Sequence, residues 1–172
     1  MNFALAFFIV GQDENRGLQI EFQKINRDGR IQVINDIEVN AESGDTFRVV
    51  CKLNTTEDLL KFNTIKVLLR KLENDTLQTL AQMQNVDNTA PDTYRIPVLG
   101  EGVSGWQAVG EYDTNTTNGR NSYVGVDRPV SVISCNDSAT YACEIVYIDP
   151  GFNVKNKIIH KQLSIQGNTF IH

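Results

Sequence analysis

The sequence has few of the residues on which catalytic and metal sites depend. Its 172 residues include two histidines, three cysteines and one tryptophan. Zinc sites need clustered cysteine and histidine ligands, and no such cluster surrounds His160 or His172. Neither histidine stands in a pattern that indicates a base for a serine or cysteine nucleophile. We therefore expect no enzyme activity, no metal and no cofactor.

Clusters of basic residues and long hydrophobic runs are also missing. The net charge is -5, and no run of lysine and arginine is interleaved with aromatic residues, which excludes a typical nucleic-acid surface. No segment reaches the roughly 18 apolar residues needed to span a bilayer, so we expect no membrane span in this chain. The 41% hydrophobic and 22% charged residues are typical of one globular domain.

Two glycine- and asparagine-rich stretches match ligand-binding motifs only in part. Gly100, Gly102 and Gly105 have the spacing of a dinucleotide fingerprint, but that motif needs a helix directly after it and none is predicted. Residues 113–119 resemble a calcium loop whose glycine is one position late and whose bidentate glutamate is missing. We interpret both stretches as turns.

The N-terminus and the sequons indicate the secretory pathway. Residues 1–11 form an apolar run followed at once by polar residues, as in a signal peptide, and a buried edge strand is the alternative. We divide the rest into an N-terminal segment at residues 12–30, one domain at residues 31–167 and an end at residues 168–172, where truncation of a longer natural protein is expected. Four sequons predict glycosylation at Asn54, Asn74, Asn115 and Asn136.

Alternating apolar and polar residues predict an all-β protein. The alternation is found at residues 18–24, 46–53, 65–72 and 140–148, with further strand signals elsewhere. Turn residues separate these stretches, and no helical periodicity extends over a long window. Residues 130–133 are expected to form a strand as well. Residues 85–128 have the least regular pattern.

One stretch carries a family resemblance. In residues 130–147, Asp137 precedes Tyr141, which stands two positions before Cys143 at the opening of an alternating strand. This resembles the tyrosine corner of variable-like domains of the immunoglobulin superfamily. The resemblance implies a two-sheet antiparallel sandwich in which the Tyr141 phenol bonds back to the loop at Asp137. It also implies a binding or adhesion module.

The cysteines fit this resemblance, and two other features depart from it. Cys51 and Cys143 both lie in alternating strands that can face each other across a sandwich, so we expect them to form a disulfide. The family's core tryptophan is missing from the strand around Ile65, and Trp106 lies far downstream. About 90 residues separate the two cysteines, which predicts an insertion before strand E, at residues 130–133.

The third cysteine has several open states. Cys135 precedes the predicted corner. It is either free, or bound to another chain in an intermolecular disulfide, or in competition with Cys143 for Cys51.

Strand parity defines a candidate binding face. With Cys143 inward, the outer face of its sheet mixes apolar and charged residues, as protein-binding surfaces do. In the alternative interpretation, residues 18–24 or the inserted region cover this face. The loops at residues 55–63 and 149–156 form a second candidate binding surface. The residues of the predicted face are Leu68, Arg70, Val146, Ile148, Ile158 and His160.

These observations together predict a secreted, extracellular recognition module that binds a protein or a glycan. The leader and the missing core tryptophan are also similar to the N-terminal immunoglobulin-like modules of molluscan fibrinogen-related lectins, which implies a role in innate defence. One alternative is the truncated ectodomain of a cell-adhesion or receptor protein. A second is an enzyme on another all-β fold.

Overall fold

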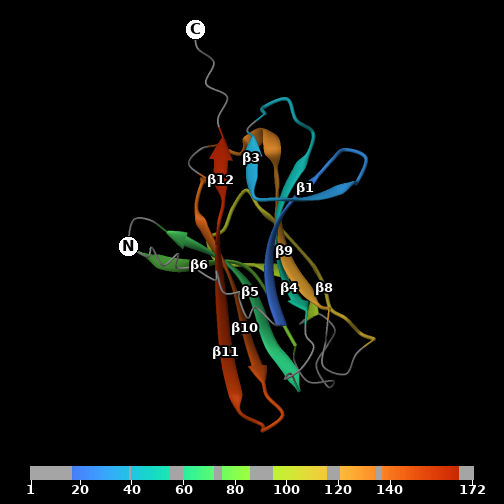
Figure 1. Cartoon of the computed structure of the whole chain (residues 1–172), viewed down its shortest axis with the longest axis vertical. Helices are drawn as coiled ribbons and strands as arrows, with labels where there is room; N and C mark the ends of the chain where they lie inside the picture. The colour runs from blue at the N-terminus through green and yellow to red at the C-terminus, as the bar shows by residue number, and fades with distance from the viewer. Residues whose placement is uncertain are drawn as a thin grey trace, which may run out of the picture.

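The computed structural model describes residues 17–38, 40–54, 60–71, 75–85, 95–115, 121–134 and 137–166. The elements whose bounds are described are strands and the 3-10 helical turn η2 (Val130–Val132). Figure 1 shows two sheets that face each other. The strands are β1 (Gly17–Ile25), β2 (Ile31–Ile34), β3 (Asp36–Glu38), β4 (Thr46–Asn54), β5 (Lys61–Lys71), β6 (Thr76–Gln84), β7 (Val98–Leu99), β8 (Gln107–Glu111), β9 (Tyr123–Pro129), β10 (Thr140–Ile148), β11 (Val154–Gln162) and β12 (Ser164–Gln166).

The strand order is that of a variable-type immunoglobulin sandwich. The first sheet has the order β2-β1-β4-β9-β8 and the second β11-β10-β5-β6-β7, and every pairing within them is antiparallel. Strands β1, β4, β9 and β8 take the places of A, B, E and D, and the second sheet those of G, F, C, C′ and C″. The predicted immunoglobulin-like two-sheet sandwich is confirmed.

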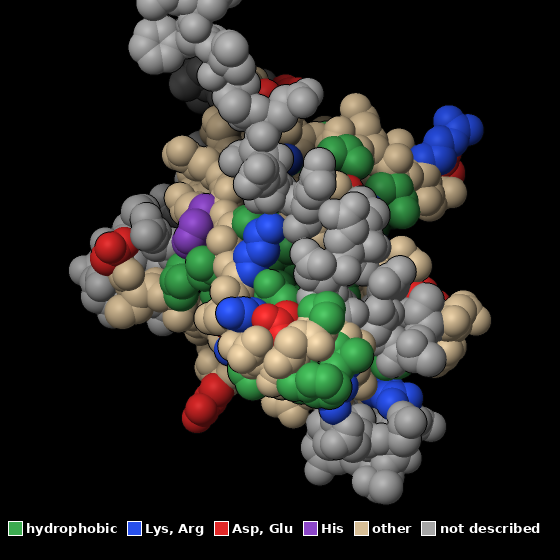
Figure 2. All heavy atoms as spheres, turned by 60° about the horizontal axis from the view of Figure 1, so that its bottom comes forward, with side chains coloured by type: hydrophobic (Ala, Val, Ile, Leu, Met, Phe, Trp, Pro, Cys, Tyr) green, Lys and Arg blue, Asp and Glu red, His purple; other side chains and the backbone are tan. Residues whose placement is uncertain are grey.

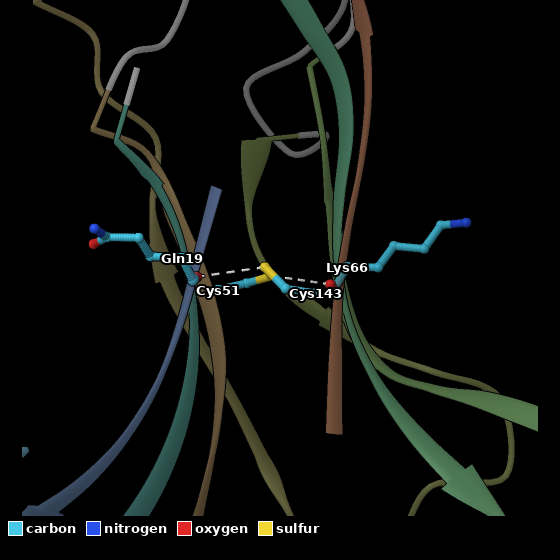
Figure 3. The surroundings of a disulfide bond; sticks show 4 residues. All are labelled: Gln19, Cys51, Lys66 and Cys143. Carbon is cyan, nitrogen blue, oxygen red and sulfur yellow. Dashed lines mark hydrogen bonds between the residues drawn. A yellow bond between two sulfur atoms is a disulfide. The ribbon is translucent and has the colours of Figure 1, made fainter. Parts of the chain in front are cut away.

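A disulfide joins the two sheets at the centre of the core. Cys51 on β4 and Cys143 on β10 are bonded, with their Cα atoms 5.4 Å apart, as predicted. Figure 3 shows the bridge between the sheets, with each sulfur near a main-chain oxygen of Gln19 or Lys66. A disulfide sulfur carries no proton, so these are packing contacts. Both cysteines are fully buried among the apolar residues of the two inner faces.

Residues 130–133 do not form the predicted strand E. The place of that strand belongs to β9, which pairs with β4. Pro129 ends β9 because proline has no N–H to donate to the ladder. The Val130 N–H then bonds to the Asp45 oxygen at 2.9 Å, and the Ile133 N–H closes the 3-10 turn onto the Val130 oxygen at 3.1 Å. The predicted insertion contains β7 and β8.

The described part of the predicted N-terminal segment lies within the sandwich. All nine residues of β1 are in register with β4. Phe22 of β1 is fully buried, and its ring packs edge-on against Tyr141 at 5.5 Å and near Phe47 at 6.1 Å. Strand β1 therefore supplies part of the core.

The corner predicted around Tyr141 is present. The buried Tyr141 hydroxyl donates to the Asp137 main-chain oxygen at 3.4 Å. The Asp137 carboxylate accepts from the Arg128 guanidinium at 2.5 Å and from the Ser134 N–H at 2.8 Å. The Arg128 guanidinium also lies 5.3 Å from the centre of the Trp106 ring. Trp106 thus packs beside the corner, outside the core position that the family gives to its tryptophan.

Burial of Tyr141 predicts a loss of stability in alkali. Burial, with the nearby Asp137 carboxylate, raises the pKa of Tyr141 above its ordinary 10.0. Below pH 10 the phenol is protonated in both states, so its contribution is fully present. Above pH 10 only the unfolded chain releases the proton, and the free energy of unfolding falls by up to about 1.4 kcal/mol per pH unit. We expect Tyr141→Phe to show a shallower decline in urea unfolding between pH 10 and about 11.5. Equal slopes for variant and wild type would contradict this assignment.

Candidate recognition surface

Three of the predicted binding residues lie beside strand β10 in the register of the second sheet: Leu68, Ile158 and His160. Leu68 and His160 flank Ala142, on either side of β10. Ile158 of β11 lies opposite Glu144 of β10. Strand β1 lies in the opposite sheet, so the described residues of 18–24 do not cover this face.

Leu68 does not provide the exposed surface that was predicted for it. It is 5% exposed, because it lies on the central strand β5, where the neighbours β10 and β6 shield it. Val146 and Ile148 are half-buried, whereas Ile158 and His160 are exposed. The side chain of Arg70 lies outside the described residues.

A charged pair lies at the middle of this face, between Lys66 of β5 and Glu144 of β10. Lys66 Nζ is 3.0 Å from a Glu144 carboxylate oxygen, and the Asn156 amide donates to the other oxygen at 2.9 Å. Burial alone would raise the pKa of Glu144, but the hydrogen bonds from Lys66 and Asn156 outweigh it and lower the pKa. A ligand that covers this pair must keep it hydrogen-bonded or lose energy through desolvation. The centre of the face is therefore a weak anchor.

The turn between β10 and β11 presents the most exposed large apolar side chain among the described residues. Phe152 is 80% exposed, and Val154, two residues on, is 67% exposed. Figure 2, which brings the lower end of the molecule forward, shows hydrophobic side chains gathered at this end with lysines and arginines beside them. We call Phe152 and Val154 the apolar tip. It falls within the second predicted candidate, the loop at residues 149–156.

Hydrogen bonds hold the turn that carries the apolar tip. The Asp149 carboxylate accepts from the Asn153 N–H at 2.9 Å and from its side-chain amide at 3.2 Å. The Asp149 N–H bonds to the Asn153 oxygen at 3.0 Å, and the Phe152 N–H bonds to the Asp149 oxygen at 2.9 Å. The hydrogen bond from the Asn153 main chain lowers the pKa of Asp149, so the carboxylate stays ionised near neutral pH.

Phe152 has an unusual backbone conformation. Its φ is 62°, in the left-handed region that a bulky residue rarely enters. Such strain costs roughly 1–3 kcal/mol and is found most often at functional sites. The hydrogen bonds between Asp149 and Asn153 close the turn that contains this residue.

A shallow hollow beside Trp106 is a weaker candidate. The Asp127 carboxylate already accepts two bonds from the Arg48 guanidinium, at 2.6 and 2.7 Å. Arg128 binds Asp137, although its buried Nε has no hydrogen-bond partner among the described residues. The charges of Asp127 and Arg128 are thus compensated within the domain. The hollow is lined by Thr46, Gly105, Trp106, Gln107, Asp127, Arg128 and Pro129.

Most of the predicted modification sites lie outside the described residues. These are Asn74, Cys135 and Asn136, together with the side chain of Asn54 at the end of β4. Asn115 is described and exposed. Its N–H bonds to the Asp113 carboxylate at 2.9 Å, which agrees with the interpretation of this stretch as a turn. Within the described ranges, no group of three or more histidine, cysteine or acidic residues could hold a metal.

Comparison with known proteins gives a structural likeness only. No family model matches the sequence, and no curated protein matches it. Among the solved structures that resemble the chain is murine CRIg, at 10% sequence identity and a TM-score of 0.48, over 87% of this chain and 98% of that one. In the part of the chain that the structure describes, no helix is long and apolar enough to cross a membrane.

Proposed function

We propose that this chain is a secreted, extracellular recognition module that binds a protein ligand through the apolar tip. The observation that carries the proposal is the 80% exposure of Phe152 in a turn fixed by Asp149. Large apolar side chains are normally buried, and an exposed aromatic ring is the residue type that anchors protein interfaces.

The fixed turn favours tight binding by this anchor. A loop that is already ordered loses little conformational entropy when it binds. Lys155 follows the tip and is half-exposed, 3.9 Å from Asp149. A ligand that receives the Phe152 ring in an apolar pocket, with carboxylates at the rim facing Lys155, would fit both features.

The proposal favours a protein over a glycan as the ligand. The apolar tip offers ring and methyl surface, whereas hydroxyl-rich sugars need many hydrogen-bonding groups. The same tip would serve a free secreted domain and the ectodomain of an adhesion or receptor protein. The predicted glycosylation at Asn115 is part of this proposal, because secretion would expose that sequon to the glycosylation machinery.

The test is a binding screen with a matched pair of variants. The oxidised domain, made tetravalent through a tag after residue 172, is screened against purified extracellular proteins and against a glycan array. For a protein ligand, we expect Phe152→Ala to weaken binding at least about 30-fold, the loss that corresponds to about 2 kcal/mol at a hot spot. Asp149→Ala should weaken binding less, by releasing the turn.

The control is Val132→Ala, which alters another exposed apolar residue, in η2 outside the turn. It should leave the affinity unchanged. Unchanged binding by Phe152→Ala would contradict the proposal, as would a ligand lost only when Lys66 and Glu144 are replaced. Binding to the glycan array alone would favour the glycan alternative.

A further inference from the structure

Strand β2 forms an open edge of the first sheet. Among the described strands it pairs only with β1. Figure 1 shows the hairpin of β1 and β2 extending sideways from the upper end of the sandwich. An open strand edge presents main-chain N–H and C=O groups to which another strand can bind.

The hairpin register identifies which residues of β2 direct their main-chain groups outward. The Asn26 N–H bonds to the Arg30 oxygen at 2.9 Å, so hydrogen-bonded pairs with β1 recur at every second residue from Arg30. Gln32 is therefore hydrogen-bonded to β1. The N–H and C=O groups of Ile31 and Val33 point to the open edge.

The side chains at this edge are apolar and lack the usual protection against pairing. Ile31 and Val33 lie on one face of the strand and are each 58% exposed. Natural edge strands commonly carry lysines that prevent edge-to-edge association. Strand β11, at the edge of the second sheet, has three, whereas β2 has none. The lysines of β11 are Lys155, Lys157 and Lys161.

The charges at the β2 edge also permit pairing with a second copy of the chain. None of the four residues of β2 carries a charge, and Asp28 and Arg30, in the turn between β1 and β2, are paired at 3.0 Å. Two β11 edges would bring lysines of like charge together, but two β2 edges would not. Of these two edges, β2 is therefore the one that can pair with itself without repulsion between lysines.

We propose that β2 pairs with β2 of a second copy of this chain, antiparallel, about a twofold axis at Gln32. In this register Ile31 of each copy lies opposite Val33 of the other, so the outward N–H and C=O groups of both residues are satisfied. The exposed side chains form apolar cross-strand pairs. A four-residue edge buries much less than the roughly 1,200 Å² of a stable interface, so the dimer is weak and reversible.

Sedimentation equilibrium of the oxidised chain at up to about 1 mM tests the dimer. We expect concentration-dependent dimerisation and at least about a tenfold higher Kd for Val33→Pro, which removes one outward N–H and leaves the bonds to β1. Val33→Lys should act in the same direction if the proline variant does not fold. The matched control is Val154→Lys in the apolar tip, which should dimerise like wild type.

Disulfide crosslinking tests the register in a Cys135→Ser background. The twofold axis places the two Gln32 residues directly opposite each other, with Cα atoms about 4.5 Å apart, within the range of a disulfide. Gln32→Cys should therefore crosslink at least about tenfold faster than Val33→Cys. A chain that stays monomeric at 1 mM overturns the proposal, as does a dimer lost with Val154→Lys but kept with Val33→Pro and Val33→Lys. Equal crosslinking of the two cysteine variants overturns the register.

Discussion

Replacing both Cys51 and Cys143 with alanine is expected to lower the free energy of unfolding by about 4.5 kcal/mol. The bridge joins residues 92 positions apart, and closing a loop of that length removes about this much chain entropy from the unfolded state. Single domains are stable by only about 5–15 kcal/mol. The variant should therefore be close to unfolding at 37 °C. Urea unfolding of the double variant and the oxidised wild type measures the difference.

The surface variant Val132→Ala serves as the control for this measurement, since it should change the stability by less than about 0.5 kcal/mol. A loss below about 1 kcal/mol in the double cysteine variant would mean that the bridge constrains the unfolded chain far less than its loop length implies.

The second large effect is expected for Phe22→Ala, which should destabilise the domain by about 3–5 kcal/mol. Phe22 is fully buried between the sheets, against Phe47 and Tyr141, so its removal leaves a cavity in the centre of the core. The same reasoning predicts that a fragment beginning at residue 31 does not fold, because it lacks β1 and leaves the edge of β4 open.

Thermal and urea unfolding of Phe22→Ala, with Ile31→Ala in the same assay, test this prediction. Ile31 is also apolar and belongs to the adjacent strand, but it is 58% exposed, and its truncation should cost little. A cooperative, stable fragment of residues 31–167 would show that β1 is dispensable and would contradict the packing described for Phe22.

The features that could be predicted from the sequence are those with local signals. The spacing of Asp137, Tyr141 and Cys143 is enough to indicate the corner, and alternation around Cys51 indicates its partner strand. The prediction of a strand at residues 130–133 is wrong because an apolar, β-branched run is compatible both with a strand and with the 3-10 turn that the structure has. Its 3-10 turn depends on a bond to Asp45, about 85 residues earlier in the chain.

The candidate site could be predicted only in part, because exposure and cross-strand contacts depend on the whole sheet. Parity gives the face on which Leu68 lies, but the neighbours that bury it are visible only in the structure. Lys66 and Glu144 meet through the register of β5 and β10. The exposure of Phe152 has a weak sequence signal, a bulky apolar residue directly after the turn residues Pro150 and Gly151.

The short parallel pair of β12 with β3 determines how the apolar tip would be presented. Figure 1 shows this pair at the upper end of the molecule and the turn between β10 and β11 at the lower end. A stalk, anchor or further domain joined after β12 would therefore hold the tip at its far end, pointing away from the attachment point.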